Sequence, residues 1–399
     1  MFDVLIIGAG ASGLMCALES ARGGKKVLVL EKAPLIGRKI LVSGNGRCNF
    51  TNRFVSPEKY NTNPAFIQTV LNQFSFSDCL NYFDELGLLY EEENLGRFFP
   101  QTGKATAITD IFKAALNETQ TTLLTSQEVI SIKKGSFFTV QTKTGEKFSA
   151  KNIVLACGSC AYPQVTGTQS GYELARKFGH TIVKPLPALS GFCLKENFSR
   201  LNGIRAQVQI SLVTQPQVQA AGEIIFTSYG INGPAVLNIS SSVSRALSKG
   251  NVALHINFLP QLKDPTAYLT ARIKKLGHRK PKDFFAGMLH ESLANLLIDF
   301  QGLRKNKPMN EQFALNKTFQ TLLAWPVTVT ALRPWNEAMV ATGGVNTREI
   351  NYNTFESLIC PHVFITGELL DVDAISGGFN LHFAWASGFC AAQALKKEK

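Results

Sequence analysis

Residues 2–31 read FDVLIIGAGASGLMCALESARGGKKVLVLE, and this stretch decides the fold. Phe2–Ile7 is a continuous apolar run, which is typical of a parallel strand buried on both faces. The glycine-rich segment Gly8–Gly13 follows it directly and leads into a helical pattern of apolar residues. Lys26–Leu30 is a second apolar strand. The order strand, turn, helix, strand predicts a βαβ unit of a Rossmann-type α/β fold.

The turn of this unit carries the pattern G-x-G-x-x-G at Gly8, Gly10 and Gly13. The first glycine allows the tight turn, the second lets a pyrophosphate approach the backbone, and the third lets helix and strand pack closely. The helix N-terminus supplies N–H donors to the phosphates. Glu31 lies 18 residues beyond Gly13, where its carboxylate accepts from ribose hydroxyls. The unit therefore predicts a bound dinucleotide.

A second glycine-rich stretch, residues 37–52, reads GRKILVSGNGRCNFTN. Its glycines, polar residues and basic residues favour a loop that wraps an anionic or polar ligand, and a surface Ω-loop is the alternative. Two further apolar strands, Ile153–Ala156 and Val363–Thr366, run into glycines at Gly158 and Gly367. Ligands of parallel sheets bind at the carboxyl ends of strands, so we expect these ends to converge on one site.

The middle of the chain is the basic part. The whole chain has 41 Lys and Arg against 29 Asp and Glu, whereas residues 191–340 alone have 17 against 8, a balance of +9. Strand-like patches alternate there with basic helical patterns, which predicts an inserted, β-rich, mixed α+β domain over residues 190–340. The dinucleotide-binding domain is then discontinuous, with a first segment at residues 1–189 and a second at residues 341–399.

The composition excludes several classes of protein. Hydrophobic residues make up 45% of the chain and charged residues 18%, which excludes wholesale disorder. Eight scattered cysteines do not form a disulfide scaffold and favour a reducing compartment. No apolar run reaches the length of about 20 residues that a membrane span requires. The six histidines lack metal-binding spacing, so we expect a cytoplasmic protein with no metal and no membrane partner.

Taken together, the motifs resemble those of the BaiN/YhiN-like FAD-dependent oxidoreductases, a family also catalogued as aminoacetone-oxidase-like. The resemblance covers essentially the whole chain, and the segments that carry it are residues 8–13, 43–52, 96–100, 343–345 and 367–388. It implies a glutathione-reductase-like FAD/NAD(P)-binding domain of Rossmann type with an inserted domain. It also implies FAD as the cofactor.

The resemblance further implies a set of FAD contacts. Those on the ADP side are Gly8, Gly10, Ala11, Ser12, Gly13, Glu31 and Lys32, with the backbone of Val129 at the adenine. Those near the pyrophosphate, the ribityl chain or the flavin ring are Arg38, Lys39, Ser43, Gly44, Arg47, Gly158, Gly367, Glu368 and Asp371. The backbone amides of Asn380 and Leu381 are expected at the pyrimidine edge, where a helix N-terminus stabilises the anionic reduced flavin.

Two residues are candidates for catalysis. Cys48 follows Arg47, which favours a thiolate, and a thiol near flavin N5 can act as a general acid. His382 lies in the C-terminal helical segment expected to face the flavin. For both, a buried packing residue is the alternative. Cys157 and Cys160 have the spacing of a redox dithiol, with packing at the end of a strand as the alternative.

Two motifs depart from the family pattern. Residues 157–160 read CGSC where the family usually has a small Thr-Gly-Gly-type turn. Residues 226–234 read FTSYGINGP, and the family usually has a histidine at the position of Ser228. Any substrate contact of that histidine is therefore lost here or has passed to Tyr229 or another group.

We expect an FAD-dependent reductase that passes hydride from flavin N5 to a C=C bond. The resemblance includes two substrate types, namely uridine of large-subunit rRNA, which gives dihydrouridine, and steroid-like small-molecule enones. The positive insert favours RNA, and its candidate contacts are Arg272, Lys274, Lys275, Arg279, Lys280 and Lys282. A solvated helix face is the alternative for this run.

The electron donor and a non-catalytic alternative remain open. Only one G-x-G-x-x-G is present, so NAD(P)H is expected to bind transiently if it is the donor. A flavin redox sensor or adaptor without turnover is the alternative to an enzyme.

Overall fold

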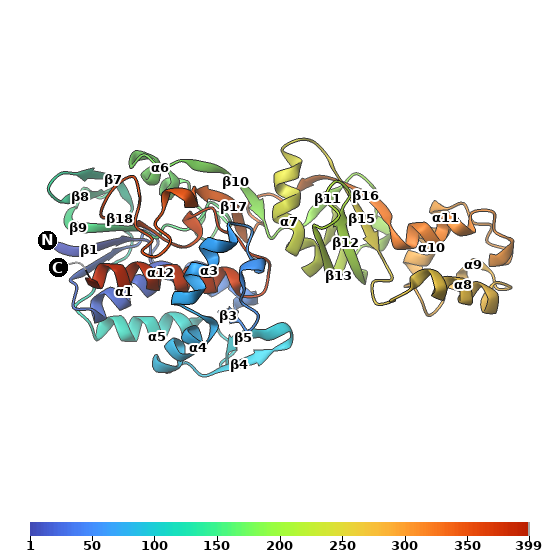
Figure 1. The fold of residues 1–399 in the computed structure, drawn as a ribbon, viewed down its shortest axis with the longest axis horizontal. Coiled ribbons are helices and arrows are strands. Elements are labelled where there is room, and N and C mark those ends of the chain that lie inside the picture. The colour runs from blue at the N-terminus through green and yellow to red at the C-terminus, as the bar shows by residue number, and fades with distance from the viewer. Residues whose placement is uncertain (398–399) are drawn as a thin grey trace. The chain divides into compact units, whose positions relative to one another are not determined.

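In a computed structural model, residues 1–397 are described, and the chain forms two compact units. Unit 1 comprises Met1–Pro187 and Ala338–Lys399, and unit 2 comprises Ala188–Glu337. The sequence analysis expected junctions after residues 189 and 340. Figure 1 labels helices and strands of both units.

Unit 1 is built on a mostly parallel sheet with strand order β6-β2-β1-β9-β8-β7, in which β18 also pairs with β9. The central strand β1 pairs in parallel with β2 and β9. Its apolar sequence fits this position, since Val4–Ile7 is buried. The strands of this sheet are β1 (Phe2–Ile7), β2 (Val27–Leu30), β6 (Thr122–Leu124), β7 (Val129–Lys134), β8 (Phe138–Thr142), β9 (Lys147–Leu155) and β18 (Val363–Ile365).

Helices α1 (Ala11–Arg22) and α12 (Phe379–Lys397) pack against each other beside this sheet (Figure 1). The contact depends on Gly388, because a Cβ atom added there would lie 2.3 Å from the carbonyl oxygen of Ser12. The two ends of the chain are therefore joined in one core.

The connections of unit 1 form smaller layers. After β2 the chain forms a small antiparallel sheet of order β3-β5-β4, and β10 pairs with β17 elsewhere. The remaining elements of unit 1 are α2 (Arg38–Val42), η1 (Ser43–Gly46), β3 (Thr51–Asn52), η2 (Pro57–Lys59), α3 (Pro64–Gln73), α4 (Phe76–Glu85), β4 (Tyr90–Glu93), η3 (Asn94–Gly96), β5 (Arg97–Pro100), α5 (Thr106–Asn117), α6 (Ser170–Lys177), β10 (Ile182–Ala188), β17 (Val340–Val345), η6 (Thr347–Glu349) and η7 (Gly367–Leu369).

Unit 2 is a closed barrel of order β11-β14-β13-β12-β15-β16, and antiparallel pairing of β11 with β16 closes it. Alternating burial along β12 and β15 fills the barrel with apolar side chains such as Val208, Ile210 and Leu254. The strands are β11 (Phe192–Leu194), β12 (Arg205–Leu212), β13 (Gln219–Thr227), β14 (Gly230–Asn232), β15 (Val252–Asn257) and β16 (Trp325–Leu332).

Helices complete unit 2, so the predicted mixed α+β insert is confirmed. Helix α7 packs on β13, and four helices lie between β15 and β16 in the chain. The helices of unit 2 are α7 (Pro234–Leu247) and, between β15 and β16, α8 (Pro265–Leu276), α9 (Pro281–Phe285), α10 (Glu291–Phe300) and α11 (Leu315–Leu323), with the short helices η4 (Ser199–Leu201) and η5 (Met309–Glu311). Across residues 1–397, no helix is both long and apolar enough to cross a bilayer.

Candidate functional site

The glycine turn between β1 and α1 is packed at two positions and open at the third. A Cβ atom at Gly8 would lie 2.4 Å from the Ala156 carbonyl oxygen, and one at Gly13 would lie 2.0 Å from the Gly8 carbonyl oxygen. A Cβ atom at Gly10 would meet nothing within 4 Å. Gly10 is also the N-cap of α1, and no side chain caps the first-turn N–H groups of this helix. This cradle fits a pyrophosphate.

Glu31 organises the same turn from the end of β2. One carboxylate oxygen accepts from the Ala9 N–H at 2.8 Å and the other accepts from the Ala33 N–H at 2.8 Å. The Gln127 N–H donates to the Glu31 carbonyl at 2.8 Å, which brings the segment just ahead of Val129 to this point. Val129 is buried at the start of β7, whereas Lys32 is exposed. The residues expected at the adenosine therefore lie near one another.

The start of α2 is joined to the glycine turn, since the Gly37 N–H donates to the Ala9 carbonyl at 2.8 Å. This places the half-buried Arg38 and Lys39 next along the chain from that turn. Lys39 forms an ion pair with Glu368, which also accepts from the Ser159 hydroxyl at 3.4 Å. The pair links α2 to the C-terminal segment and to the loop after β9.

The carboxyl ends of β1, β9 and β18 converge, as the sequence predicts, because β9 pairs in parallel with both other strands. Gly367 follows β18 with φ +67°, and a Cβ atom there would lie 2.6 Å from the Ser12 hydroxyl oxygen of α1. Its N–H donates to the buried Ser387 hydroxyl at 2.9 Å. Gly158, with φ +69°, would meet nothing within 4 Å with a Cβ added.

Asp371 and Asn380 serve the backbone around them. The Asp371 carboxylate accepts from the Gly343 N–H of β17 at 2.9 Å. The Asn380 side chain accepts from the Ala374 N–H at 2.9 Å and donates to the Ala374 carbonyl at 3.0 Å. It thereby closes the loop ahead of α12. The backbone N–H groups of Asn380 and Leu381 lie in the first turn of this helix, where no intrahelical acceptor is available.

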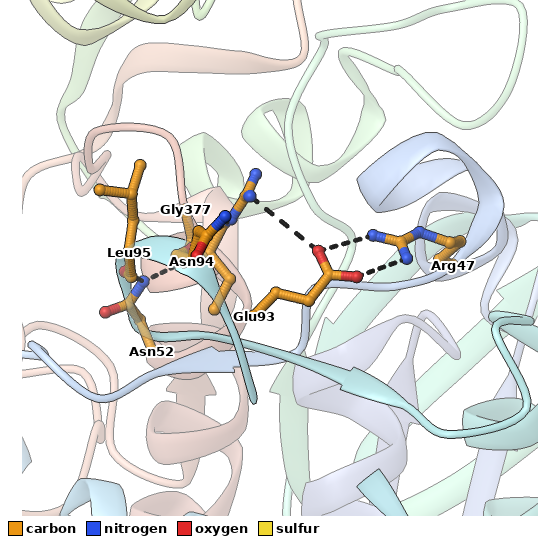
Figure 2. A network of polar contacts seen from close by, with 7 residues as sticks. Arg47, Asn52, Glu93, Asn94, Leu95 and Gly377 are labelled. Carbon is orange, nitrogen blue, oxygen red and sulfur yellow. Dashed lines mark hydrogen bonds and ion pairs between the residues drawn. The ribbon is translucent and has the colours of Figure 1, made fainter. Parts of the chain in front are cut away.

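Arg47 is engaged by a carboxylate, which the sequence did not reveal. Its guanidinium donates to both oxygens of Glu93, at 2.7 and 3.0 Å (Figure 2). The guanidinium carbon also lies 4.1 Å from the ring centre of Phe99. The pair raises the pKa of Arg47 and lowers the pKa of Glu93. An anionic ligand at Arg47 would have to compete with Glu93. Ser43 uses its hydroxyl to donate to the Ile40 carbonyl at 2.7 Å, and Gly44 turns the chain with φ +55°.

The burial of both catalytic candidates favours the packing alternative. Cys48 has no exposed surface, and burial raises the pKa of its thiol to about 12. His382 is equally buried, and burial lowers its pKa to about 4. Its Nδ1 lies 2.9 Å from the Thr51 hydroxyl, and its Nε2 lies 3.3 Å from the Phe74 carbonyl oxygen. Neither side chain reaches a surface where a substrate could meet it, so neither is retained as a catalytic acid.

The other tempting side chains are also engaged within the protein. Cys157 and Cys160 are both free thiols, and the Cys157 thiol donates to the Ile7 carbonyl at 3.5 Å. Burial raises the pKa of Cys157 to about 12, which favours the packing interpretation. In unit 2, the Tyr229 hydroxyl accepts from Asn232, and the Arg333 guanidinium lies 4.3 Å from the Tyr229 ring centre.

The basic run of unit 2 divides into structural and exposed residues. Arg272 donates to the carbonyls of Phe284 and Ala286 and so ties α8 to α9, and Lys282 pairs with Glu291 at 2.6 Å. The prediction that Arg272 and Lys282 are free to contact phosphates is therefore wrong, because both side chains are engaged within unit 2. The side chains that remain exposed are Lys274, Lys275, Arg279 and Lys280.

The sequence did not indicate the role of one polar residue, Asn52. Asn52 of β3 donates to the carbonyl oxygens of Leu95 and Gly377, at 3.1 and 2.8 Å (Figure 2). Its position at the end of the stretch 37–52 was the available signal, but its partners lie 43 and 325 residues away.

Comparison with known proteins places the chain in a family. Residues 2–394 match the family described as HI0933-like protein Rossmann domain. The chain is 32% identical over 404 residues to the 3-dehydro-bile acid delta(4,6)-reductase of Clostridium scindens, covering 98% of each chain. It is 30% identical over 401 residues to the ribosomal RNA dihydrouridine synthase of Escherichia coli, covering 99% of this chain and 98% of the other.

Two further likenesses were found. The ribosomal RNA dihydrouridine synthase of Haemophilus influenzae is 29% identical over 408 residues, covering 99% of this chain and 98% of the other. The solved 3-ketosteroid-delta4-(5alpha)-dehydrogenase of Rhodococcus jostii RHA1 is similar with a TM-score of 0.51 at 13% identity, covering 100% and 97% of the two chains, which supports the fold alone. The protein thus belongs to the HI0933-like family, and it is an FAD-dependent oxidoreductase of Rossmann-type fold with an inserted domain.

Proposed function

We propose that this oxidoreductase reduces the C=C bond of a uridine in large-subunit ribosomal RNA and so forms dihydrouridine. Two full-length relatives at 29% and 30% identity are named for this activity. The observation in this chain that carries the proposal is the cationic surface of unit 2. It consists of Lys274, Lys275, Arg279 and Lys280.

The cationic surface is suited to phosphates because its charges are not compensated. Lys274 and Lys275 end α8, and Arg279 and Lys280 follow in the connection to α9. None of the four forms an ion pair within residues 1–397. Lys and Arg that neutralise phosphates release counterions, which drives RNA binding. An uncharged enone does not need such a surface.

FAD, when bound and reduced, would supply the hydride for the C=C bond. The chain's own residues would hold it: the open turn at Gly10 and the α1 N-terminus would receive the pyrophosphate, with Glu31 at the ribose. The N-terminus of α12 would offer N–H donors and partial positive charge to the pyrimidine edge, which would favour the reduced, anionic form. The proton that completes the reduction comes from a group other than Cys48 or His382, since both are buried. We further propose that NAD(P)H is a transient electron donor.

A small-molecule enone is the second candidate, and it is favoured by the 32% identity to the bile-acid reductase. The two are separated by mixing anaerobically reduced, FAD-loaded protein with unmodified 23S rRNA or with a steroid enone. The proposal expects the absorbance of oxidised flavin to return with the RNA and not with the enone. The opposite pattern would move the assignment to the enone.

A further inference from the structure

We propose that Asn52 is a positioning residue, which fixes the turn ahead of α12 and thereby raises the reduction potential of bound FAD. The proposal rests on the proposed placement of the flavin at the N-terminus of α12. Asn52 does not touch the reacting atoms in this account. It acts through the backbone of Gly377.

The Asn52 side chain uses its whole amide group on backbone partners. Its Nδ2 donates to the Gly377 carbonyl at 2.8 Å and to the Leu95 carbonyl at 3.1 Å, while its Oδ1 accepts from the Phe54 N–H at 2.9 Å. The residue is 2% exposed. Buried hydrogen bonds of this kind are costly to leave unmade, so the amide joins three segments in one geometry.

Both turns that Asn52 joins have left-handed backbone. Leu95 has φ +66° although it is not glycine, and its side chain is 77% exposed, so packing does not hold it there. Gly377 has φ +128° and Gly378 has φ +98°. A non-glycine residue persists at such a φ only where its surroundings determine it, whereas glycine adopts positive φ freely. Asn52 is a surrounding group common to the two turns.

Neighbouring contacts fix the rest of the loop but leave Gly377 to Asn52. The Ile375 N–H donates to the Lys59 carbonyl at 3.0 Å, and the Tyr60 hydroxyl donates to the Phe379 carbonyl at 3.0 Å. These contacts lie on either side of Gly377. Within the described residues, the side chain that donates to the Gly377 carbonyl is Asn52.

The Leu95 turn is itself braced, which makes it a fixed support. Arg97 donates to the Asn94 carbonyl at 2.9 Å and lies 3.9 Å from Glu93, which is held by Arg47 (Figure 2). The β4–β5 hairpin therefore restrains Gly377 through Asn52. The consequence is a fixed direction for the first N–H groups of α12.

A second observation indicates that a polar ligand belongs beside this turn. The Asn49 side chain is nine-tenths buried, and its Oδ1 has no hydrogen-bond partner within the described residues. A Cβ atom added at Gly378 would lie 2.8 Å from this oxygen. A buried, unpaired acceptor against the start of α12 is consistent with a ligand site there.

The test is the midpoint potential of FAD-loaded protein, measured by dye equilibration, in wild type, Asn52→Ala and Asn52→Leu. Loss of the Gly377 bond should lower the affinity for reduced FAD about fivefold more than that for oxidised FAD, since a helix terminus stabilises the anionic form by this order. At about 30 mV per tenfold for a two-electron couple, the potential falls by about 20 mV. Asn52→Leu keeps about the size of the side chain and adds no charge near the flavin, so it remains testable if Asn52→Ala does not fold.

The matched control is Asn152→Ala. Asn152 is also a buried amide, and it donates to the backbone carbonyl of Asp3 at 3.3 Å. It lies where β9 pairs with β1 and does not contact the turn ahead of α12. It should lose stability with no change in potential. An unchanged potential in both FAD-loaded Asn52 variants, or an equal shift in the control, would overturn the proposal. The RNA assay above reports separately on the proposed function, because it needs only the wild type.

Discussion

Two alanine substitutions in the glycine turn should separate FAD binding from stability. Gly10→Ala should weaken FAD binding, and Gly13→Ala should lower the stability of the protein. In Gly10→Ala the new methyl group enters open space, because nothing lies within 4 Å of it and the backbone is extended at φ −82° and ψ −168°. In Gly13→Ala the methyl group would lie 2.0 Å from the Gly8 carbonyl oxygen. The first variant should therefore keep near wild-type stability, and the second should fold with reduced stability.

The size of each effect follows from these contacts. At Gly10 the methyl group occupies the approach of the pyrophosphate and removes at least one charge-assisted hydrogen bond, which contributes about 1.5–3 kcal/mol. That loss corresponds to an increase of about ten- to a hundredfold in the Kd for FAD. The stability of the apoprotein should change by less than about 1 kcal/mol, since less freedom of the unfolded chain offsets a poorer N-cap. Gly13→Ala should cost about 3 kcal/mol through overpacking.

The assay is FAD titration of the apoprotein by quenching of flavin fluorescence, with thermal unfolding of the same apoprotein samples. Gly10→Ala should show weak binding at near wild-type stability, and Gly13→Ala should show a lowered Tm. If Gly10→Ala binds FAD as tightly as the wild type, the pyrophosphate is not at this turn and the reasoning is refuted.

Three further predictions concern RNA binding, pH and thiol reactivity. The first replaces the four exposed cations of unit 2 with Gln, namely Lys274, Lys275, Arg279 and Lys280. The slope of log affinity for structured RNA against log salt should become about 3 shallower, at roughly 0.7–0.9 per phosphate contact. An unchanged slope would exclude these residues as phosphate contacts. Since burial lowers the pKa of His382 from 6.5 to about 4, the unfolded chain takes up the proton first. The free energy of unfolding is therefore not reduced by this group above pH 6.5, and it falls by about 3 kcal/mol between pH 6.5 and pH 4. Denaturant titrations should show this fall in the wild type and not in His382→Gln. Cys48, buried and with a thiol pKa raised to about 12, should resist alkylation at pH 8 until the protein unfolds; fast labelling in the folded state, located by mass spectrometry, would contradict its burial.

The Rossmann core could be predicted because its signals are local. The apolar run of β1, the glycine turn and the acidic end of β2 are consecutive in the sequence, and the structure places them as the spacing indicates. Convergence of the distant segment Val363–Ile365 was also predictable, since parallel strands present their carboxyl ends at one edge. The contacts of individual FAD-binding residues remain predictions.

The barrel and several side-chain roles could not be predicted, because they depend on partners far away in the chain. Closure of the barrel needs β11 to pair with β16, and neither strand carries a mark of the other. Arg47 looked free until Glu93, 46 residues later, was placed against it. Arg272 looked like a phosphate contact, but carbonyls at the end of α9 take its donors. The burial of Cys48 likewise comes from packing that the motif does not encode.

The most direct measurement of the central claim is mass spectrometry of large-subunit rRNA nucleosides from a strain that lacks this gene, complemented with the wild type or with Gly10→Ala. One dihydrouridine signal should disappear in the deletion strain, return with the wild type, and return weakly or not at all with Gly10→Ala. Dihydrouridine that is unchanged in the deletion strain would contradict the claim that rRNA uridine is the substrate.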